Sequence, residues 1–363
     1  MDWVDARDRL IAHALESGWA AAGVAGLTPF RTARARTRDA ITAGRMDGMP
    51  WLSLERIDSA ADLGRRYPWA RAAISLAWPY RPAMALGPGA KTPHGDPGRP
   101  RGRIGAYACL TDDASARSSD YHEVLAARCD ELVAWMRAEL GDVKVKRFID
   151  HGWAMDRPIA ERAGIGFAGK NTTLLTEAAG SYVLLAELQV SLPLLATTPS
   201  RRSCGKCAAC IPACPTGALV APGVMDATKC ISYLTIEHEG SIDEELRPLM
   251  GTWAFGCDLC MEACPINHRL APDAVADAGG STAGGPVPSP DLIECLDLTE
   301  AEFDSRFRGT PIWRAGRKRL ARNAAIALGN AGDGGAAPAL RCSARDDPDA
   351  VVRESAAWAL TRL

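Results

Sequence analysis

Two stretches of sequence decide the organisation of this chain: CGKCAACIPACP, residues 204–215, and CDLCMEACP, residues 257–265. The first stretch places four cysteines with the spacing Cys-x2-Cys-x2-Cys-x3-Cys, followed by proline. Proteins with two 4Fe–4S clusters use this spacing, in which three thiolates bind one cluster and the fourth crosses to the other. We therefore expect iron–sulfur clusters in this part of the chain.

The second stretch repeats the motif without its first cysteine, because that position is Ala254. Two cubane clusters need eight thiolates and the two runs supply seven, so Cys230, the other cysteine nearby, fills the vacancy. We assign one cluster to Cys204, Cys207, Cys210 and Cys264, and the other to Cys214, Cys230, Cys257 and Cys260. The alternative is a pair of structural zinc sites, because Cys-x2-Cys is also zinc-ribbon spacing.

The composition is that of an ordinary globular protein, with 363 residues, 47% hydrophobic residues and a formal net charge of −2. With so small a net charge, a polyanionic partner must be met by local patches. The chain has 12 cysteines, and their crowding in one region argues for metal or redox chemistry in a reducing compartment. The four outside the motifs are expected to be small buried hydrophobes: Cys109, Cys129, Cys295 and Cys342.

The N-terminus carries acids where a signal peptide has bases, and no stretch has the roughly 20 apolar residues of a membrane helix. We expect a cytoplasmic protein that is a monomer and does not associate with membranes.

Residues 1–195 alternate helical and strand-like patterns, which favours an α/β domain. Helices are expected at 5–17, 120–140 and 157–164, and strands at 72–78, 143–149 and 181–188. The proline- and glycine-rich residues 81–103 predict a loop.

Three further regions follow. Residues 196–270, with their cysteine–proline turns, predict a bacterial ferredoxin-like two-cluster domain. Residues 271–310 are expected to be a linker region that begins with a low-complexity segment at 271–290. In residues 311–363, the stretch 323–328 (NAAIAL) recurs as 355–360 (SAAWAL), which indicates a HEAT-like helical repeat. The alternative is two alanine-rich helices that cover a core.

Several stretches around the cysteines resemble the epoxyqueuosine reductase family. They are 204–217 (CGKCAACIPACPTG), 226–237 (DATKCISYLTIE), 255–267 (FGCDLCMEACPIN), 308–330 (RGTPIWRAGRKRLARNAAIALGN), 150–174 (DHGWAMDRPIAERAGIGFAGKNTTL) and Asp120-Tyr121-His122. The resemblance covers roughly residues 45–363 and agrees with the role given to Cys230.

The resemblance implies cobalamin, with its lower base detached, in the N-terminal α/β domain. It implies a transfer RNA substrate, bound through its anticodon stem-loop, whose wobble-position epoxyqueuosine is reduced to queuosine. An external electron donor such as a flavodoxin or ferredoxin would supply the clusters. Asp120-Tyr121-His122 approaches the D-x-H-x-x-G signature of cobalt-ligating histidines, but Leu125 stands where the glycine should be.

The resemblance also implies roles for individual residues. Asp150 occupies the proton-donor position, and a carboxyl above an apolar corrin face would stay protonated near neutral pH. Asp120, Tyr121 and His122 match a second polar cluster that assists proton transfer or orients the substrate, although Asp120 also suits a helix cap. Residues near the cofactor would be Cys109, Lys229 and Ser232.

The sequence departs from the family pattern in three places. His151 replaces a small hydroxyl residue, residues 110–119 look like an insertion, and Phe167-Ala168 replaces a tryptophan-containing pair. These changes leave room for another substrate.

For RNA phosphates, two basic patches are candidates. One lies at residues 31–38 (RTARARTR), and the other comprises Arg314, Arg317, Lys318, Arg319 and Arg322, unless the latter is simply a solvated helix face.

Two other functions are compatible with the motifs. One is a cobalamin and iron–sulfur reductase of the reductive dehalogenase kind, acting on a small molecule. The other is an electron-transfer protein without a substrate of its own, which a domain of 195 residues ahead of the clusters disfavours.

Overall fold

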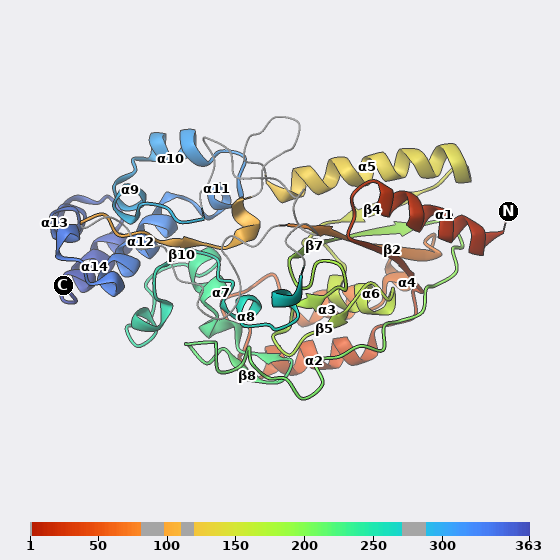
Figure 1. The fold of residues 1–363 in the computed structure, drawn as a ribbon, viewed down its shortest axis with the longest axis horizontal. Helices are drawn as coiled ribbons and strands as arrows, with labels where there is room; N and C mark the ends of the chain where they lie inside the picture. Colours follow the sequence, from red (N-terminus) through yellow and green to blue (C-terminus); the bar gives the residue numbers. More distant parts are fainter. Residues whose placement is uncertain (1, 81–97, 110–119, 271–287) are drawn as a thin grey trace.

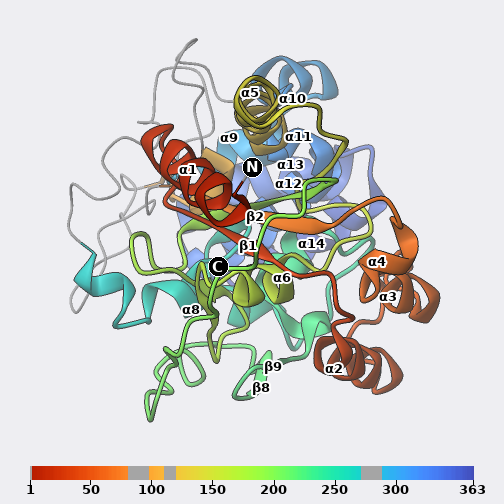
Figure 2. The same cartoon turned by 90° about the vertical axis from the view of Figure 1, so that its right-hand side faces the viewer.

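A central antiparallel sheet organises the N-terminal half (Figures 1 and 2). The computed structural model describes residues 2–80, 98–109, 120–270 and 288–363. Strand order is β1-β2-β7-β4, and every neighbouring pair is antiparallel. The strands are β1 (Ala21–Ala25), β2 (Ala72–Pro79), β4 (Val145–Phe148) and β7 (Val183–Val190). The expected strands at 72–78, 143–149 and 181–188 are thus confirmed within two residues at each end.

Helices cover both faces of this sheet. Figure 2 shows α1 (Trp3–Glu16) and α5 (Tyr121–Leu140) on one side and α6 (Asp156–Arg162) on the other. Alternation along β2 explains the layers, because Ile74 and Leu76 pack in the core with α1 and α5, whereas Ala73 and Ala77 pack against α6. The three helices expected from sequence are confirmed. Helices α2 (Arg31–Thr42), α3 (Leu54–Ala60) and α4 (Leu63–Arg66) lie near the α6 side.

The cysteine-rich region consists mostly of turns, with short elements between them. They are β5 (Phe167–Ala168), β6 (Leu174–Leu175), β8 (Leu219–Ala221), β9 (Val224–Met225), α7 (Ile231–Ile236), β10 (Trp253–Phe255) and α8 (Leu259–Glu262). Strand β10 pairs in parallel with β3 (Arg103–Ile104). This pairing joins the cysteine-rich region to a segment that precedes it by about 150 residues in the sequence.

The C-terminal region is helical. It contains α9 (Leu292–Asp297), α10 (Glu300–Phe307), α11 (Pro311–Ala315), α12 (Arg317–Ala331), α13 (Ala337–Asp346) and α14 (Ala350–Leu360). The expected linker at 271–310 is wrong for its second half. Asp291 caps α9, a Thr299–Glu302 capping box begins α10, and Leu292 and Phe303 are buried. Residues 271–287 of that linker, residues 81–97 of the predicted loop and the 110–119 insertion lie outside the described residues.

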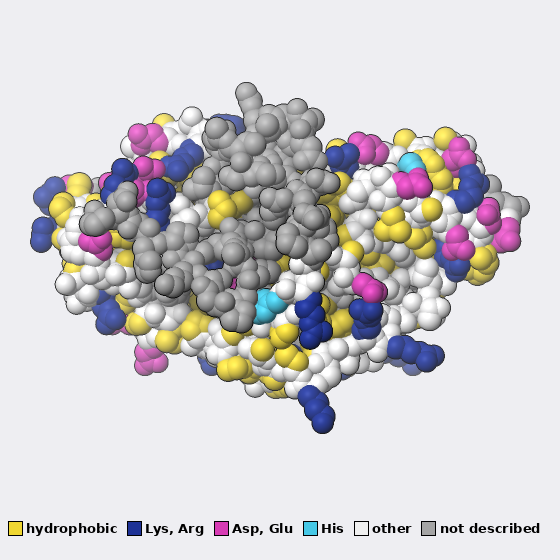
Figure 3. All heavy atoms as spheres, in the orientation of Figure 1, with side chains coloured by type: hydrophobic (Ala, Val, Ile, Leu, Met, Phe, Trp, Pro, Cys, Tyr) yellow, Lys and Arg dark blue, Asp and Glu magenta, His cyan; other side chains and the backbone are white. Residues whose placement is uncertain are grey.

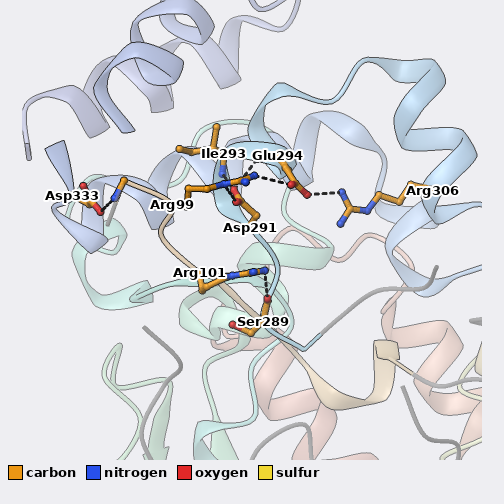
Figure 4. Close-up of polar contacts among 9 residues, drawn as sticks. Arg99, Arg101, Ser289, Asp291, Ile293, Glu294, Arg306 and Asp333 are labelled. Carbon is orange, nitrogen blue, oxygen red and sulfur yellow. Dashed lines mark hydrogen bonds and ion pairs between the residues drawn. The ribbon is translucent and has the colours of Figure 1, made fainter. Parts of the chain in front are cut away.

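A strap formed by residues 98–104 ties the N-terminal half to these helices (Figure 4). Arg99 pairs with Asp291 at 2.7 Å and with Glu294 at 2.8 Å. At the start of the strap, the Gly98 N–H donates to Asp333 over 2.9 Å. Because the Arg99 side chain is 59% exposed, its ion pairs contribute little individually, so the backbone pairing of β3 with β10 is the firmer part of this junction.

Two of the basic residues at 314–322, Arg317 and Arg322, are buried and so belong neither to an RNA-facing patch nor to a solvated helix face, whereas Arg314 and Lys318 are exposed. Arg322 is 1% exposed and donates to the carbonyls of Leu234, His238 and Gly240. Arg317 is buried and paired with Asp347. These arginines act inside the protein, where they join the helical region to the cysteine-rich region. The charge pattern predicted a surface patch, whereas packing against segments distant in the sequence buries these two arginines.

A pair of carboxyl groups lies between the sheet and α6. Glu187 of β7 is 0% exposed and bonds to Asp156, the first residue of α6. Ser75 donates to Glu187 over 3.3 Å. Burial, followed by the proximity of the partner carboxyl, raises the pKa of Glu187 well above its usual range. The two acids therefore share a proton, which satisfies oxygens that would otherwise have no donor.

No helix of the described residues is long and apolar enough to cross a membrane.

The carboxyl pair predicts a pH-dependent stability. Because folding raises the pKa of Glu187, the stabilisation is complete below the unfolded pKa and is lost as the pH rises through the folded pKa. Replacing Glu187→Gln keeps an N–H donor for Asp156 and removes the titration of Glu187, while Asp156 still titrates. We expect the wild-type midpoint of thermal unfolding to fall from pH 5 to pH 8 by several degrees more than that of the variant. Parallel pH profiles of the two proteins would contradict the shared proton.

Candidate active site and cluster-binding cysteines

Asp150 begins the loop that follows β4, and its backbone is unusual. Its φ is +51°, in the left-handed region that side chains other than glycine rarely adopt. Such a conformation is retained where the surroundings enforce it, frequently at functional sites. Here the next turn, at Gly152, is held by Arg56, whose guanidinium donates to the Gly152 carbonyl over 2.6 Å. The constrained loop therefore fixes the orientation of the Asp150 carboxyl.

The Asp150 carboxyl is bonded to Tyr121. The Tyr121 hydroxyl donates to Oδ2 of Asp150 over 2.5 Å. Burial, together with the negative charge of Asp150, raises the pKa of Tyr121, which therefore stays protonated and acts as a donor. Tyr107 packs edge-on against the Tyr121 ring at 5.8 Å between centroids. These contacts leave Oδ1 of Asp150 for another partner.

Asp120 and His122 lie at the start of α5 and are joined by an arginine from the opposite end of the chain. Asp120 caps α5 by accepting from the His122 N–H, and its Oδ1 lies 2.8 Å from Nδ1 of His122. Arg314 of α11 forms an ion pair with the other oxygen of Asp120. Figure 1 shows α11 beside the start of α5. The capping role and the role in a polar cluster therefore hold together for Asp120.

Two histidines complete this cluster. His122 stacks on Tyr121 at 4.2 Å and lies 5.2 Å from the His151 ring. Burial lowers the pKa of His122, so its imidazole is neutral near pH 7. We call the group of Asp120, Tyr121, His122 and Asp150, with Arg314, the acid–tyrosine site.

Three cysteines of the first run lie together with one cysteine of the second. Burial raises the pKa of the Cys210 thiol, and the nearby Cys204, Cys264 and Cys207 raise it further. These are the four cysteines that the sequence assigned to one cluster. Cys264 is buried, whereas Cys207 is exposed.

The other four cysteines form a second group beside the first. Burial raises the pKa of Cys260 to about 12, with contributions from Cys230, Asp258 and Cys210 and then from Cys214. The pKa of Cys257 is also raised, by burial and then by Cys230 and Cys260. Buried thiols this close together ionise only when cations neutralise them, as iron does. The donor set therefore fits two metal clusters.

Backbone N–H groups point at these sulfurs. The Lys170 N–H donates to Cys204 over 3.4 Å. The N–H groups of Ser232 and Tyr233 bond to Cys230, and that of Leu259 bonds to Cys257. Hydrogen bonds to cluster sulfurs adjust the reduction potential. The described residues contain no group of three or more His, Cys, Asp or Glu side chains that could hold a single metal ion.

Helix α7 links the second cysteine group to the acid–tyrosine site. Cys230 is its N-cap, and Glu237 is its C-cap. Burial raises the pKa of Glu237, and the charge of Asp150 raises it further, which places this carboxyl near the site. The six residues of α7 thus connect the thiols to the neighbourhood of the Asp150 loop.

The three residues expected near the cofactor are dispersed. Cys109 ends the short helix η1 (Ala106–Cys109) and packs against the C-terminal core, and burial raises its pKa to about 12. Lys229 is exposed and lies 3.5 Å from Asp226. Ser232 follows Cys230 in α7. Among the described contacts, none of the three bonds to the acid–tyrosine site.

Sequence reasoning missed Tyr107 and Glu237 and gave Arg314 a different role. All three reach the site from elements distant in sequence, so no local motif marks them. Tyr182 was also missed: its hydroxyl is buried, has no partner among the described residues, and lies near Tyr80 and Cys260. An unpartnered polar atom between the sheet and the second cysteine group suits a bound molecule at that junction.

Two family models match the chain. A 4Fe-4S double cluster binding domain matches residues 203–267. Epoxyqueuosine reductase QueG, DUF1730, matches residues 61–151, which include Asp120 and Asp150. The first match sets the zinc alternative aside.

Individual proteins agree with these matches. The epoxyqueuosine reductase of Pseudomonas aeruginosa is 41% identical over 251 residues, which are 68% of this chain and 68% of that protein. The enzyme of Burkholderia pseudomallei is 36% identical over 97% of this chain and 91% of its own. A crystal structure of epoxyqueuosine reductase with an epoxyqueuosine-modified tRNA-Tyr stem loop aligns with a TM-score of 0.84 and 31% identity, covering 99% of this chain and 91% of that one. With an α/β region, a ferredoxin-like cluster domain and a helical C-terminal region in common, the chain belongs to the epoxyqueuosine reductase family.

Proposed function

We propose that the chain reduces epoxyqueuosine at the wobble position of tRNA to queuosine. The reaction removes the epoxide oxygen as water and leaves an alkene, so it needs two electrons and two protons. The constrained Asp150 carboxyl, beside cysteine groups that suit two clusters, carries the proposal. The solved relative with an epoxyqueuosine-modified stem loop supports an anticodon stem-loop as substrate.

The clusters would be held as the sequence predicted. One cluster would be bound by Cys204, Cys207, Cys210 and Cys264. The other cluster would be bound by Cys214, Cys230, Cys257 and Cys260. The proximity of Cys204, Cys207 and Cys264 to Cys210 supports the first of these sets. An external carrier such as a flavodoxin or ferredoxin would supply the electrons.

Cobalamin, with its lower base detached, would occupy the junction between the sheet and the second cysteine group. Its cobalt would supply a low-potential centre that collects single electrons and delivers them to the strained ring. The unpartnered hydroxyl of Tyr182 and the remaining oxygen of Asp150 fit a polar-edged molecule there. The candidates for contacts with the edge of the cofactor remain Cys109, Lys229 and Ser232.

Asp150 would deliver a proton to the departing oxygen. Tyr121 occupies Oδ2, so the proton would leave from Oδ1. Tyr121 fixes the carboxyl, whereas Asp120 and Arg314 fix the start of α5, on which Tyr121 and His122 lie. His151, directly after Asp150, adds a titratable ring to this site and would affect substrate handling.

Two structural proposals accompany this function. The packing of α12 and α13 against α14 supports a HEAT-like hairpin at 311–363. A monomer working in the cytoplasm, where tRNA is modified, would suffice for the reaction.

Loading of the protein with its cofactors should be measurable directly. Anaerobically reconstituted protein is expected to contain about eight iron atoms per chain and to take up cobalamin with a base-off visible spectrum. Iron at that level without corrin uptake would contradict the cobalamin part. With both cofactors bound, an unchanged nucleoside in an epoxyqueuosine stem-loop would contradict the substrate.

Replacing Asp150→Asn removes the proton but keeps the size of the side chain. Turnover of the stem-loop by reconstituted protein is expected to fall by about 10²–10⁴-fold, with iron and corrin contents unchanged. Near-normal turnover would exclude Asp150 as the proton donor.

Replacing Tyr121→Phe removes only the hydrogen bond to Asp150. Because one such bond to a charged group contributes about 1.5–3 kcal/mol, turnover should fall by about 10–100-fold. Tyr67→Phe, which removes a hydroxyl bonded to Arg66 at the surface, is the matched control. Equal turnover of the two variants would exclude a positioning role for Tyr121.

A further inference from the structure

The first cysteine group reaches the surface at Cys207. Of the eight motif cysteines, Cys207 is exposed, whereas Cys210 and Cys264 are buried and the others are partly covered. The second group lies against the hydrophobic clusters of the catalytic and cysteine-rich regions, through Cys260, Cys230 and Cys257. Electrons from outside therefore have their shortest approach at Cys207.

Several positive side chains belong to the same stretch of chain as this exposed cysteine or bond to that stretch. Lys206 directly precedes Cys207 and is exposed. Lys170 donates from Nζ to the Gly205 carbonyl over 2.9 Å. Arg201 and Arg202 lie just ahead of the first cysteine and are also exposed.

A cleft extends this positive surface to α2. Its volume is about 550 Å³, and its walls include Arg31 and Arg36 of α2 together with Arg202. Arg31 and Arg36 are exposed, and neither guanidinium has a hydrogen bond or ion pair among the described residues. We call the six cationic side chains the outer rim: Arg31, Arg36, Lys170, Arg201, Arg202 and Lys206.

Few acids offset these charges. Glu161 lines the cleft and accepts from the Ala168 N–H, and Glu177 pairs with Arg202. The whole chain carries a net charge of −2, so the positive sign is a property of this surface. Figure 3 shows Lys and Arg side chains along the lower edge of the face drawn, with few acidic groups among them.

We propose that the outer rim is the docking surface for a small acidic one-electron carrier protein of the flavodoxin or ferredoxin class. Complementary charge speeds the encounter and orients the partner, here with its redox group towards Cys207. One electron leaves the carrier, which is oxidised, and enters the iron–sulfur group, which is reduced, and no bond forms or breaks. The proposed function requires an external supply of electrons, and the outer rim would be the surface at which the carrier binds.

An RNA backbone is the other polyanion that a basic surface could bind. The contacts favour the carrier, because Lys206 is next to Cys207 in the chain and Lys170 bonds to the nearby Gly205 carbonyl. The acid–tyrosine site that must meet the nucleoside is built by α5, α11 and the loop after β4. The basic patch at 31–38 is also partly neutralised, since Arg34 and Arg38 share the single carboxylate of Asp58.

The test reverses three rim charges that have no partner among the described residues, in the variant Arg31→Glu/Arg36→Glu/Arg201→Glu. The matched control, Arg137→Glu/Arg341→Glu/Arg362→Glu, reverses three exposed arginines elsewhere. Reconstituted holoprotein is titrated with oxidised flavodoxin in a calorimeter at low and high salt, and with the unmodified stem-loop by fluorescence anisotropy. The rate at which the iron–sulfur clusters are reduced, by reduced flavodoxin or by dithionite, is measured without RNA from the loss of their visible absorbance.

We expect flavodoxin affinity and the flavodoxin-driven rate to fall at least tenfold at low salt in the rim variant only. Its dithionite-driven rate and its stem-loop affinity should stay within twofold of the wild type. Unchanged flavodoxin affinity, a tenfold loss of stem-loop affinity, or an equal loss in the control variant would overturn the proposal. None of these readouts involves reduction of the nucleoside, so a failure of the proposed function would be seen separately. In that case dithionite would reduce the wild-type protein, but the protein would leave epoxyqueuosine unchanged.

Discussion

The structure depends on eight thiols brought into two adjacent groups between a sheet and a helical region. Buried thiols so close to one another resist ionisation, as the raised pKa values of Cys260 and Cys257 indicate. Iron would compensate this electrostatic penalty, and the backbone N–H groups aimed at Cys204 and Cys230 contribute further. The surrounding elements are short and rich in turns, so binding of metal would supply much of their stability.

The second feature on which the account depends is long-range assembly of the acid–tyrosine site. Asp150 follows β4, Tyr121 begins α5, Glu237 ends α7, and Arg314 comes from α11. Helix α7 joins the thiols to this site, and the Arg314–Asp120 ion pair joins the site to the helical region. All three regions of the chain therefore contribute to the acid–tyrosine site.

Local patterns predicted the parts of the structure that are local. Alternation and helical spacing located β2, β4, β7 and α5, and cysteine spacing located the cluster region. The resemblance to a family brought out Asp150 and Asp120. Charge patterning failed at Arg317 and Arg322, because burial against distant carbonyls and Asp347 cannot be read from neighbouring residues. The helices α9 and α10 were missed because a low-complexity segment precedes them and hid their capping signals.

The exchange of ligands between the two cysteine runs is the central claim, and electron paramagnetic resonance of reduced protein tests it most directly. Cys264→Ala should give the spectrum of Cys204→Ala, because both lose a ligand of the same cluster and keep the other cluster intact. Cys260→Ala should give a different spectrum, with the opposite cluster remaining. A Cys264→Ala spectrum that matches Cys260→Ala instead would show that each run binds its own cluster, and the interlocked arrangement would be wrong.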